Sequence, residues 1–297
     1  MLKKRNIRLC FSGAIMFILF VQTFATQATD EINETMNIEE ASAWELGIGV
    51  GFGKRDNIII NSDNIDIDAF INIAYFGEKF FFDNGDIGYF VTDNTDWNIN
   101  LIVGANSERQ FFEKLNNFGI DITNTTLNSD TGETETHDTS FEIEPTDRDT
   151  PIDAGIEIIG DGEWGNLQLQ INTDISNKHN GFEVWGGYSK KLTVGNLEFR
   201  SSIGFIYKSS QWTNYFYGIR PSEVMLAPNN IDYILPPYQA TASTNYFYKF
   251  TMNYPLTDKL KIVALFEREY LGKSVRNSPI VNKNEFTTQF MGLFYEF

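Results

Sequence analysis

Cysteine, histidine and basic residues are scarce in this sequence of 297 residues. It has one cysteine, two histidines, and 23 Lys plus Arg against 40 Asp plus Glu, which gives a formal net charge of −17. One cysteine cannot form an internal disulfide, and two histidines leave little for a zinc site. Nucleic-acid binding depends on basic surface, so nucleic acid is not an expected partner. We expect no metal site, no cofactor and no catalytic residue.

Long hydrophobic runs are also missing. The longest, Leu9–Val21, holds 13 residues, whereas a transmembrane helix needs about 20. It follows a basic stretch at 3–8 and precedes small residues at Ala25 and Ala28. This order predicts a signal peptide over residues 1–28, cleaved after Ala25 or Ala28, rather than a retained anchor.

What the sequence has in abundance is aromatic residues, glycine and alternation. It contains 26 Phe, 13 Tyr and 23 Gly, and from Trp44 onward apolar and polar residues alternate along one stretch after another. A period of two is typical of β-strands. The alternation predicts twelve strands, at 44–53, 65–76, 79–83, 86–91, 96–106, 153–160, 165–175, 181–191, 196–208, 242–254, 258–270 and 286–297. The one weak helical pattern lies at 221–227, inside a loop.

Each strand has an apolar and a polar face. In the second strand, one face is predicted to hold Ile65, Ile67, Ala69, Ile71, Ile73 and Tyr75, opposite Asp66, Asp68 and Asn72. In the strand at 165–175, Leu169 and Ile171 alternate with Gln170 and Asn172. Glycines alternate along the first strand (Gly47, Gly49, Gly51, Gly53), where we expect them to leave space inside a barrel.

An antiparallel sandwich with one solvated face would show the same alternation. Three features favour a membrane barrel instead. Many strands have 10 to 13 residues, close to the roughly 9–11 that cross a bilayer at a tilt. The polar face is rich in Gly, Asn, Gln and Ser, as a barrel lumen requires. Aromatic residues lie near strand ends, as in an interfacial girdle: Trp44, Trp97, Tyr207, Tyr254 and Tyr270.

Connection lengths support the barrel independently. Short connections, such as Gly77–Glu78 and Pro255–Thr257, alternate with mostly longer ones, above all 107–152 and 209–241. Outer-membrane barrels have an even number of antiparallel strands, with short periplasmic turns and long outer loops. We therefore predict an all-β transmembrane antiparallel barrel of about 12 strands over 44–297. Residues 29–43 are acidic and are expected to form a periplasmic N-terminal segment.

The last strand ends on an aromatic residue with apolar residues at alternate positions. These are Phe297, Tyr295, Leu293 and Met291. The pattern resembles the C-terminal signal read by the barrel assembly machinery, which we expect to be a partner together with outer-membrane lipid. The expected location is the cell outer membrane.

Two segments resemble a known family, the MltA-interacting protein MipA/OmpV family of outer-membrane proteins. One is the glycine-rich hairpin at 74–89 and the other is the Tyr-Gly-Ile segment at 215–223; the start and end of the mature chain are similar too. The matching positions include Tyr75, Gly77, Glu78, Phe82, Asp83, Asn84, Gly85, Asp86, Gly88, Tyr217, Gly218 and Pro221. The acidic insert within 121–153 departs from the family pattern.

The resemblance implies a non-enzymatic role. It implies an outer-membrane scaffold that brings a murein lytic transglycosylase together with a bifunctional penicillin-binding protein during cell-wall assembly. The alternative is a small-solute channel or envelope-stress porin of the OmpV type. Its lumen would be lined by Asp66, Asp68, Asn98, Asn100, Gln168, Gln170, Asn172 and Asp174.

Other candidate chemistry is weaker. Residues 121–153 hold ten acidic residues and one basic residue, Arg148, but lack the spacing of a calcium loop, so a solvated loop is favoured over cation binding. His179 lies near Ser176 in a stretch of ordinary turn composition, which favours a turn over a catalytic pair. The carboxylate pair Glu267 and Glu269 is interpreted as lumen charge.

The loop 209–241 combines four prolines with many aromatic residues, including Trp212, Tyr215, Phe216 and Tyr217. Aromatic side chains of this number are costly to leave in water. We expect them to pack on the barrel rim or fold into the lumen, with a partner-binding face as the alternative.

Overall fold

The computed structural model describes residues 43–60, 62–93, 96–112, 118–127, 134–143, 148–226 and 233–297. The predicted signal peptide and almost all of the predicted periplasmic segment 29–43 lie outside these residues. No helix in the described part of the chain is both long and apolar enough to cross a membrane.

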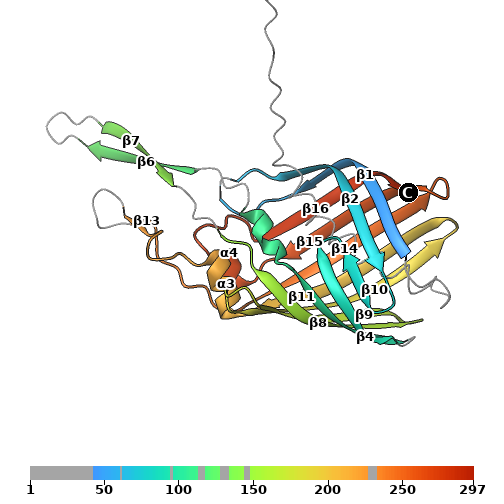
Figure 1. Ribbon diagram of the computed structural model, residues 1–297. Helices are drawn as coiled ribbons and strands as arrows, with labels where there is room; N and C mark the ends of the chain where they lie inside the picture. Colours follow the sequence, from blue (N-terminus) through green and yellow to red (C-terminus); the bar gives the residue numbers. More distant parts are fainter. Residues whose placement is uncertain are drawn as a thin grey trace, which may run out of the picture.

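Twelve antiparallel strands close into a barrel (Figure 1). Around the wall the order is β1-β16-β15-β14-β11-β10-β9-β8-β5-β4-β3-β2. The bounds are β1 Ala43–Arg55, β2 Ile65–Phe76, β3 Phe80–Asp83, β4 Asp86–Asp93, β5 Trp97–Ala105, β8 Ile152–Gly162, β9 Gly165–Asp174, β10 Phe182–Val194, β11 Leu197–Lys208, β14 Ser243–Pro255, β15 Leu260–Tyr270 and β16 Glu285–Glu296. The predicted fold class is confirmed, and each predicted strand coincides with an observed one to within a few residues.

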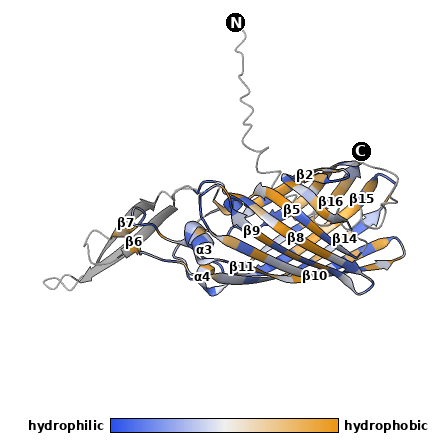
Figure 2. Cartoon of the chain, turned by 60° about the horizontal axis from the view of Figure 1, so that its bottom comes forward, coloured by the Kyte–Doolittle hydropathy of each residue, from blue (hydrophilic) through white to orange (hydrophobic). Residues whose placement is uncertain are grey.

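The outer wall is apolar because alternate side chains point away from the lumen. Phe52, Leu101, Ile203 and Met291 are among the exposed large hydrophobic residues, and apolar residues mark the barrel wall in Figure 2. In a bilayer these side chains contact lipid rather than water. Leu169 is exposed on this wall, as its alternation with inward-facing Gln170 predicts.

The predicted apolar outward face of β2 is correct in the second half of the strand and wrong in the first half. Ile71 and Ile73 are exposed, but Ile65 and Ile67 are buried and Asp66 is exposed. The register between β1 and β2 shifts between Val50 and Gly53 because of a β-bulge, which reverses the alternation at the start of β2. Asp66 and Asp68 are therefore not lumen residues, contrary to the prediction.

Glycines on the inner face of β1 make room for phenylalanine rings. A Cβ atom on Gly47 would overlap the Phe294 ring, and one on Gly49 would overlap the Phe70 ring. Phe70 stacks on Phe294 with ring centroids 5.7 Å apart. These glycines leave space inside the barrel, as expected, and aromatic side chains occupy that space.

The wall contains one unusually short hairpin, β3–β4. Its turn is Asn84–Gly85, with φ of 48° and 112°, values that a two-residue hairpin turn requires and that Asn and Gly adopt readily. The Asn84 side chain accepts from the Ile73 backbone N–H at 2.9 Å and donates to Asn72. Within the described residues, β3 pairs with β2 only at Ala74, Tyr75 and Phe76.

Helices close the end of the barrel opposite the start of β1 and the end of β16. They are η2 Ser107–Phe111, α3 Ser210–Tyr217 and α4 Lys273–Arg276, and α3 and α4 lie together at this end in Figure 1. Their buried side chains join Ile58, Ile59 and other loop residues in one apolar cluster, which we call the outer cap. No helix forms over 221–226; the helix of this loop is α3, where the Ser209 side chain accepts from the Trp212 N–H.

Two small hairpins project from the same end (Figure 1). They are β6 Phe118–Leu127 with β7 Thr134–Ile143, and β12 Met225–Leu226 with β13 Tyr233–Leu235. Most of the first hairpin lies in the acidic segment 121–153, and its backbone forms a paired antiparallel ladder.

Candidate functional site

The two ends of the barrel differ, which fixes its orientation. Phe297 donates its backbone N–H to the Leu46 carbonyl, so the first and last strands finish at the same end, where the connections are short. In outer-membrane barrels the short turns face the periplasm. The outer cap therefore faces the outside.

The lumen contains two separate pockets. The larger, which we call the outer chamber, has a volume of about 290 Å³ and lies beneath the outer cap. The smaller, the periplasmic pocket, has a volume of about 100 Å³. No residue of the described chain lines both pockets. Phe70, Phe290 and Phe294 belong to a buried apolar cluster inside the barrel, and Phe70 and Phe294 form part of the wall of the periplasmic pocket.

The outer chamber is acidic. Its lining includes eight carboxylates and three cationic side chains. The carboxylates are Asp83, Asp86, Glu108, Asp153, Glu157, Glu183, Glu267 and Glu269, and the cations are Arg55, Lys208 and Lys249. Glu267 and Glu269 thus lie in the lumen, as predicted.

Amide side chains stabilise several of these carboxylates by hydrogen bonding. Glu157 accepts from Asn100 at 2.9 Å and from Gln168 at 2.5 Å, and Glu269 accepts from Asn245 at 2.6 Å. Buried carboxylates are costly unless such donors surround them. The Asn and Gln residues that mark the polar strand faces therefore have a structural role inside the barrel.

A buried ion pair joins the outer cap to the chamber. Lys208 lies 2.9 Å from Glu108, and the Tyr217 hydroxyl donates to the same carboxylate. The Lys208 ammonium also lies 4.3 Å from the centroid of the Trp212 ring. Burial, and then the charge of Glu108, raises the pKa of Tyr217 well above its ordinary value. The pair ties η2 and α3 to the outer end of β11.

Aromatic side chains of the loop 209–241 are buried at the outer end of the barrel. The first of the two expectations, packing on the barrel rim or in the lumen, predicts this. Trp212, Phe216 and Tyr217 have no exposed surface and lie in the outer cap. At its edge Arg148 forms an ion pair with Glu223 at 2.5 Å and donates to the Gly218 carbonyl. On the surface, hydrogen bonding to Lys178 lowers the pKa of Asp149.

Asp153, Asp174 and His179 approach one another closely enough to suggest a metal site. The hydrogen bonds argue against that assignment. His179 accepts from the Gly181 N–H through Nδ1, which leaves Nε2 as the donor to Asp153 at 3.1 Å. One Asp174 oxygen accepts three backbone N–H groups of the following turn. The histidine has no free lone pair for a metal, and the group is a hydrogen-bonded turn.

Ser176 and His179 are not arranged as a catalytic pair for hydrolysis. The Ser176 hydroxyl donates to Asp174 at 2.7 Å and accepts from the Ile152 N–H. A nucleophilic serine needs a histidine as its base, and the contacts of His179 go to Asp153 and Gly181 instead. The side chains of most of the acidic insert, including His137, lie outside the described residues, so its charge chemistry stays a prediction.

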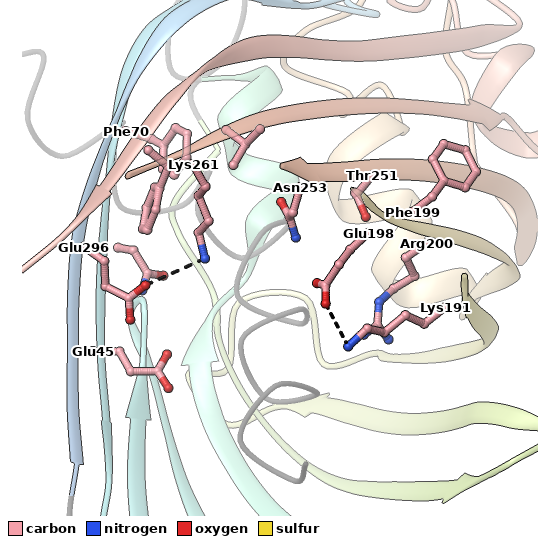
Figure 3. Close-up of a pocket in the computed structure, with 13 residues that line it drawn as sticks. Glu45, Phe70, Lys191, Glu198, Phe199, Arg200, Thr251, Asn253, Lys261 and Glu296 are labelled. Atoms are coloured by element: carbon pink, nitrogen blue, oxygen red, sulfur yellow. Dashed lines mark ion pairs between the residues drawn. The ribbon is translucent and has the colours of Figure 1, made fainter. Parts of the chain in front are cut away.

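The periplasmic pocket lies at the end of the barrel where β1 begins and β16 ends, with Glu45 and Glu296 in its lining (Figure 3). Three acidic and three basic side chains line it: Glu45, Glu198, Glu296, Lys191, Arg200 and Lys261. Two ion pairs are dashed in the figure, Lys191 with Glu198 at 3.3 Å and Lys261 with Glu296 at 3.8 Å. These charged side chains are partly exposed, so the mouth is a polar surface facing the periplasm.

The positions of the family resemblance serve the wall and the cap. One segment forms the periplasmic end of β2 and the β3–β4 hairpin, and it contains Tyr75, Gly77, Glu78, Phe82, Asp83, Asn84, Gly85, Asp86 and Gly88. The other lies at the end of α3 and just after it, and contains Tyr217, Gly218 and Pro221. Met291, Leu293, Tyr295 and Phe297 are exposed on the outward face of the last strand. Their predicted role as an assembly signal stays a prediction.

Sequence reasoning did not name Arg55, Glu108 or Glu183, and it placed Lys208 only on the polar face of the strand at 196–208. Arg55, Glu183 and Lys208 each lie on the inward face of a strand at its outer end. Glu183 lies within the predicted strand 181–191, and extending the alternation of the first strand by two residues would have added Arg55. Glu108 lies in η2, outside every strand, and no periodicity points to it.

Proteins with sequences similar to this chain are described as outer-membrane proteins. A family model described as MltA-interacting protein MipA matches residues 46–297. The outer membrane protein Omp26La of Vibrio anguillarum is 24% identical over 242 residues, and the outer membrane protein OmpV of Vibrio cholerae is 23% identical over 243; each match covers 80% of both chains. A solved NanC porin aligns at 9% identity with a TM-score of 0.38, over 86% of this chain and 100% of its own. The chain belongs to the MltA-interacting protein MipA family and is an outer-membrane β-barrel protein.

Proposed function

We propose that this barrel is a non-enzymatic adaptor that holds cell-wall enzymes at the inner surface of the outer membrane. The partners are a murein lytic transglycosylase and a bifunctional penicillin-binding protein. The family description supports the first partner, because it names interaction with MltA. The second partner follows from the resemblance stated for the sequence.

The observation that carries the proposal is the difference between the two ends. The outer end is covered by a buried apolar cluster, whereas the periplasmic end presents Lys191, Arg200 and Lys261 among carboxylates. A periplasmic enzyme can reach only the second end. Charged side chains on such a rim accelerate association and set orientation more than they add affinity.

Charge reversal at the periplasmic mouth tests the proposal. Lys191→Glu with Arg200→Glu should slow association of a purified lytic transglycosylase with the barrel, measured by surface plasmon resonance at two ionic strengths. The difference from wild type should shrink at high salt, where screening acts over about 3 to 10 Å. Lys178→Glu, on the opposite end, is the matched control and should bind like wild type. Equal binding by all three proteins would exclude the mouth from the interface.

The predicted acidic segment 29–43 is a second contact on the same side. Deleting 29–42 should weaken capture at low salt more than at high salt, with the barrel still folded. The full-length mature barrel serves as the control. If neither the full-length nor the shortened barrel binds a transglycosylase, the adaptor proposal fails and the solute-channel alternative takes its place.

A further inference from the structure

Arg55 is a buried cation for which the described residues supply no anion. Its side chain lines the outer chamber and the residue is 8% exposed. Two rings pack against the guanidinium from the same side: its carbon lies 5.1 Å from the Phe111 centroid and 4.8 Å from the Phe286 centroid, and the two centroids are 5.2 Å apart. In the described part of the chain it has no ion pair and no side-chain hydrogen bond, and Nε is a buried donor without a partner.

Aromatic rings do not replace the hydrogen-bond acceptors that a guanidinium needs. Its five N–H donors point outward in the plane of the group, and the two neighbouring rings supply no oxygen acceptor to them. Burying such donors without acceptors is costly. The edge has the geometry that binds a carboxylate through two parallel hydrogen bonds. Arg55 therefore carries an unfilled anion-binding edge inside the chamber.

Glu183 presents the opposite charge in the same chamber. It lines the outer chamber from β10, and among the described residues no hydrogen bond or ion pair engages its carboxylate. Lys208, its register partner on β11, attracts Glu183 electrostatically, but the Lys208 ammonium group forms its ion pair with Glu108, at 2.9 Å. In the barrel order β10 lies five positions from β1, so Glu183 projects from the wall that faces Arg55.

We propose that the outer chamber binds a small zwitterionic solute, with its carboxylate on Arg55 and its ammonium group on Glu183. Neither side chain forms an ion pair or side-chain hydrogen bond among the described residues, and the two have opposite charges on facing walls, as a ligand with one charge at each end requires. The amides of Gln168, Gln170 and Asn172 on β9 also line the chamber and supply uncharged polar contacts. The volume of about 290 Å³ is far larger than one water molecule needs. This inference does not depend on enzymes binding at the periplasmic mouth.

Three probes of similar length test the contribution of each ligand charge separately. They are 6-aminohexanoate, hexanoate and hexylamine, titrated calorimetrically into the full-length mature barrel in detergent micelles. The wild-type barrel should bind 6-aminohexanoate at least about 10-fold more tightly than either singly charged probe, because each charged hydrogen bond contributes about a factor of 10 to 100.

The variants assign each end of the ligand. Arg55→Gln should weaken 6-aminohexanoate binding about 10- to 100-fold and leave hexylamine binding unchanged, and Glu183→Gln should do the same with hexanoate unchanged. Lys178→Gln and Glu163→Gln remove the same charges outside the chamber and should bind like wild type. Heat-modifiable migration on gels confirms that each variant is folded.

Two results would overturn the proposal. One is the absence of 6-aminohexanoate binding to a folded wild-type barrel, which would mean that water fills the chamber. The other is an equal loss of all three probes in both variants, which would mean that Arg55 and Glu183 only support the chamber walls. Neither result bears on transglycosylase binding, so the two proposals fail separately.

Discussion

Tyr217 illustrates how single residues secure the outer cap. Its hydroxyl donates to Glu108 in a fully buried setting. Tyr217→Phe should reduce the stability of the cap by about 1.5 to 3 kcal/mol, because a buried carboxylate loses a donor. Thermal unfolding followed by Trp fluorescence measures the loss. Tyr215→Phe, whose hydroxyl contacts the Asp149 carbonyl at an exposed site, is the control and should unfold near the wild-type temperature.

The same residue gives the cap a dependence on alkaline pH. The raised pKa of Tyr217 means that the folded cap holds this proton more tightly than the unfolded chain does. Its contribution is therefore complete below the ordinary tyrosine pKa of about 10 and is lost as pH rises through the raised value. The wild-type cap should loosen above about pH 10 in a fluorescence titration, and the Tyr217→Phe variant should lose less stability over that range. Equal loss in both proteins would assign the effect to other groups.

Neighbouring residues of one strand face different solvents. Leu169→Arg places a charge in lipid and should cost about 2 to 4 kcal/mol near the bilayer midplane. Gln170→Arg points into the acidic outer chamber and should be mild. Refolding yield into lipid vesicles compares the two variants. Similar yields would be incompatible with the orientation of β9.

At the scale of elements, alternation located the strands because every barrel strand separates lipid from lumen. It could not locate the bulge between Val50 and Gly53, which depends on pairing with β2. It also missed α3. That helix has eight residues, too few for a clear period, and its stability comes from burying Trp212 and Phe216 against other segments.

The last strand offers a test of assembly as distinct from stability. Phe297 is 71% exposed and its ring contacts Tyr295, so deleting it removes little packing. The deletion should leave the melting temperature of refolded protein nearly unchanged but lower the amount of barrel assembled in cells, measured by heat-modifiable migration. Replacing exposed Met291 by Leu is the control. Normal assembly after the deletion would refute a C-terminal signal.

For the molecule as a whole, the two pockets bear on the channel alternative. The outer cap covers one end of the lumen, and within the described chain no lining residue is common to the outer chamber and the periplasmic pocket. We expect little steady conductance in planar bilayers. Deleting the α3 segment 210–217 should increase it, which serves as the positive control. A large conductance in the intact protein would favour the solute channel.

The outer chamber shows which features of the lumen can be predicted from the sequence and which cannot. The polar faces of strands can be predicted one strand at a time, and Gln168, Gln170 and Asn172 were assigned to the lumen in this way. The pairing of Lys208 with Glu108 joins residues 100 positions apart. Arg55 and Glu183 become a pair of facing charges only after the barrel closes, since β1 and β10 share no local pattern.

Because the β3–β4 hairpin is short, part of β2 lacks a hydrogen-bonded neighbour on that side among the described strands. Ile73 directs its carbonyl toward that hairpin, so Ala69 and Ile71 direct their backbone groups to the same side, where the described strands provide no partner. In hydrogen–deuterium exchange, the amides of Ala69 and Ile71 should exchange quickly while those of Phe70 and Asn72, bonded to β1, stay protected. Upon heating, the barrel should open first between β2 and the β3–β4 hairpin, on the side that borders the outer chamber.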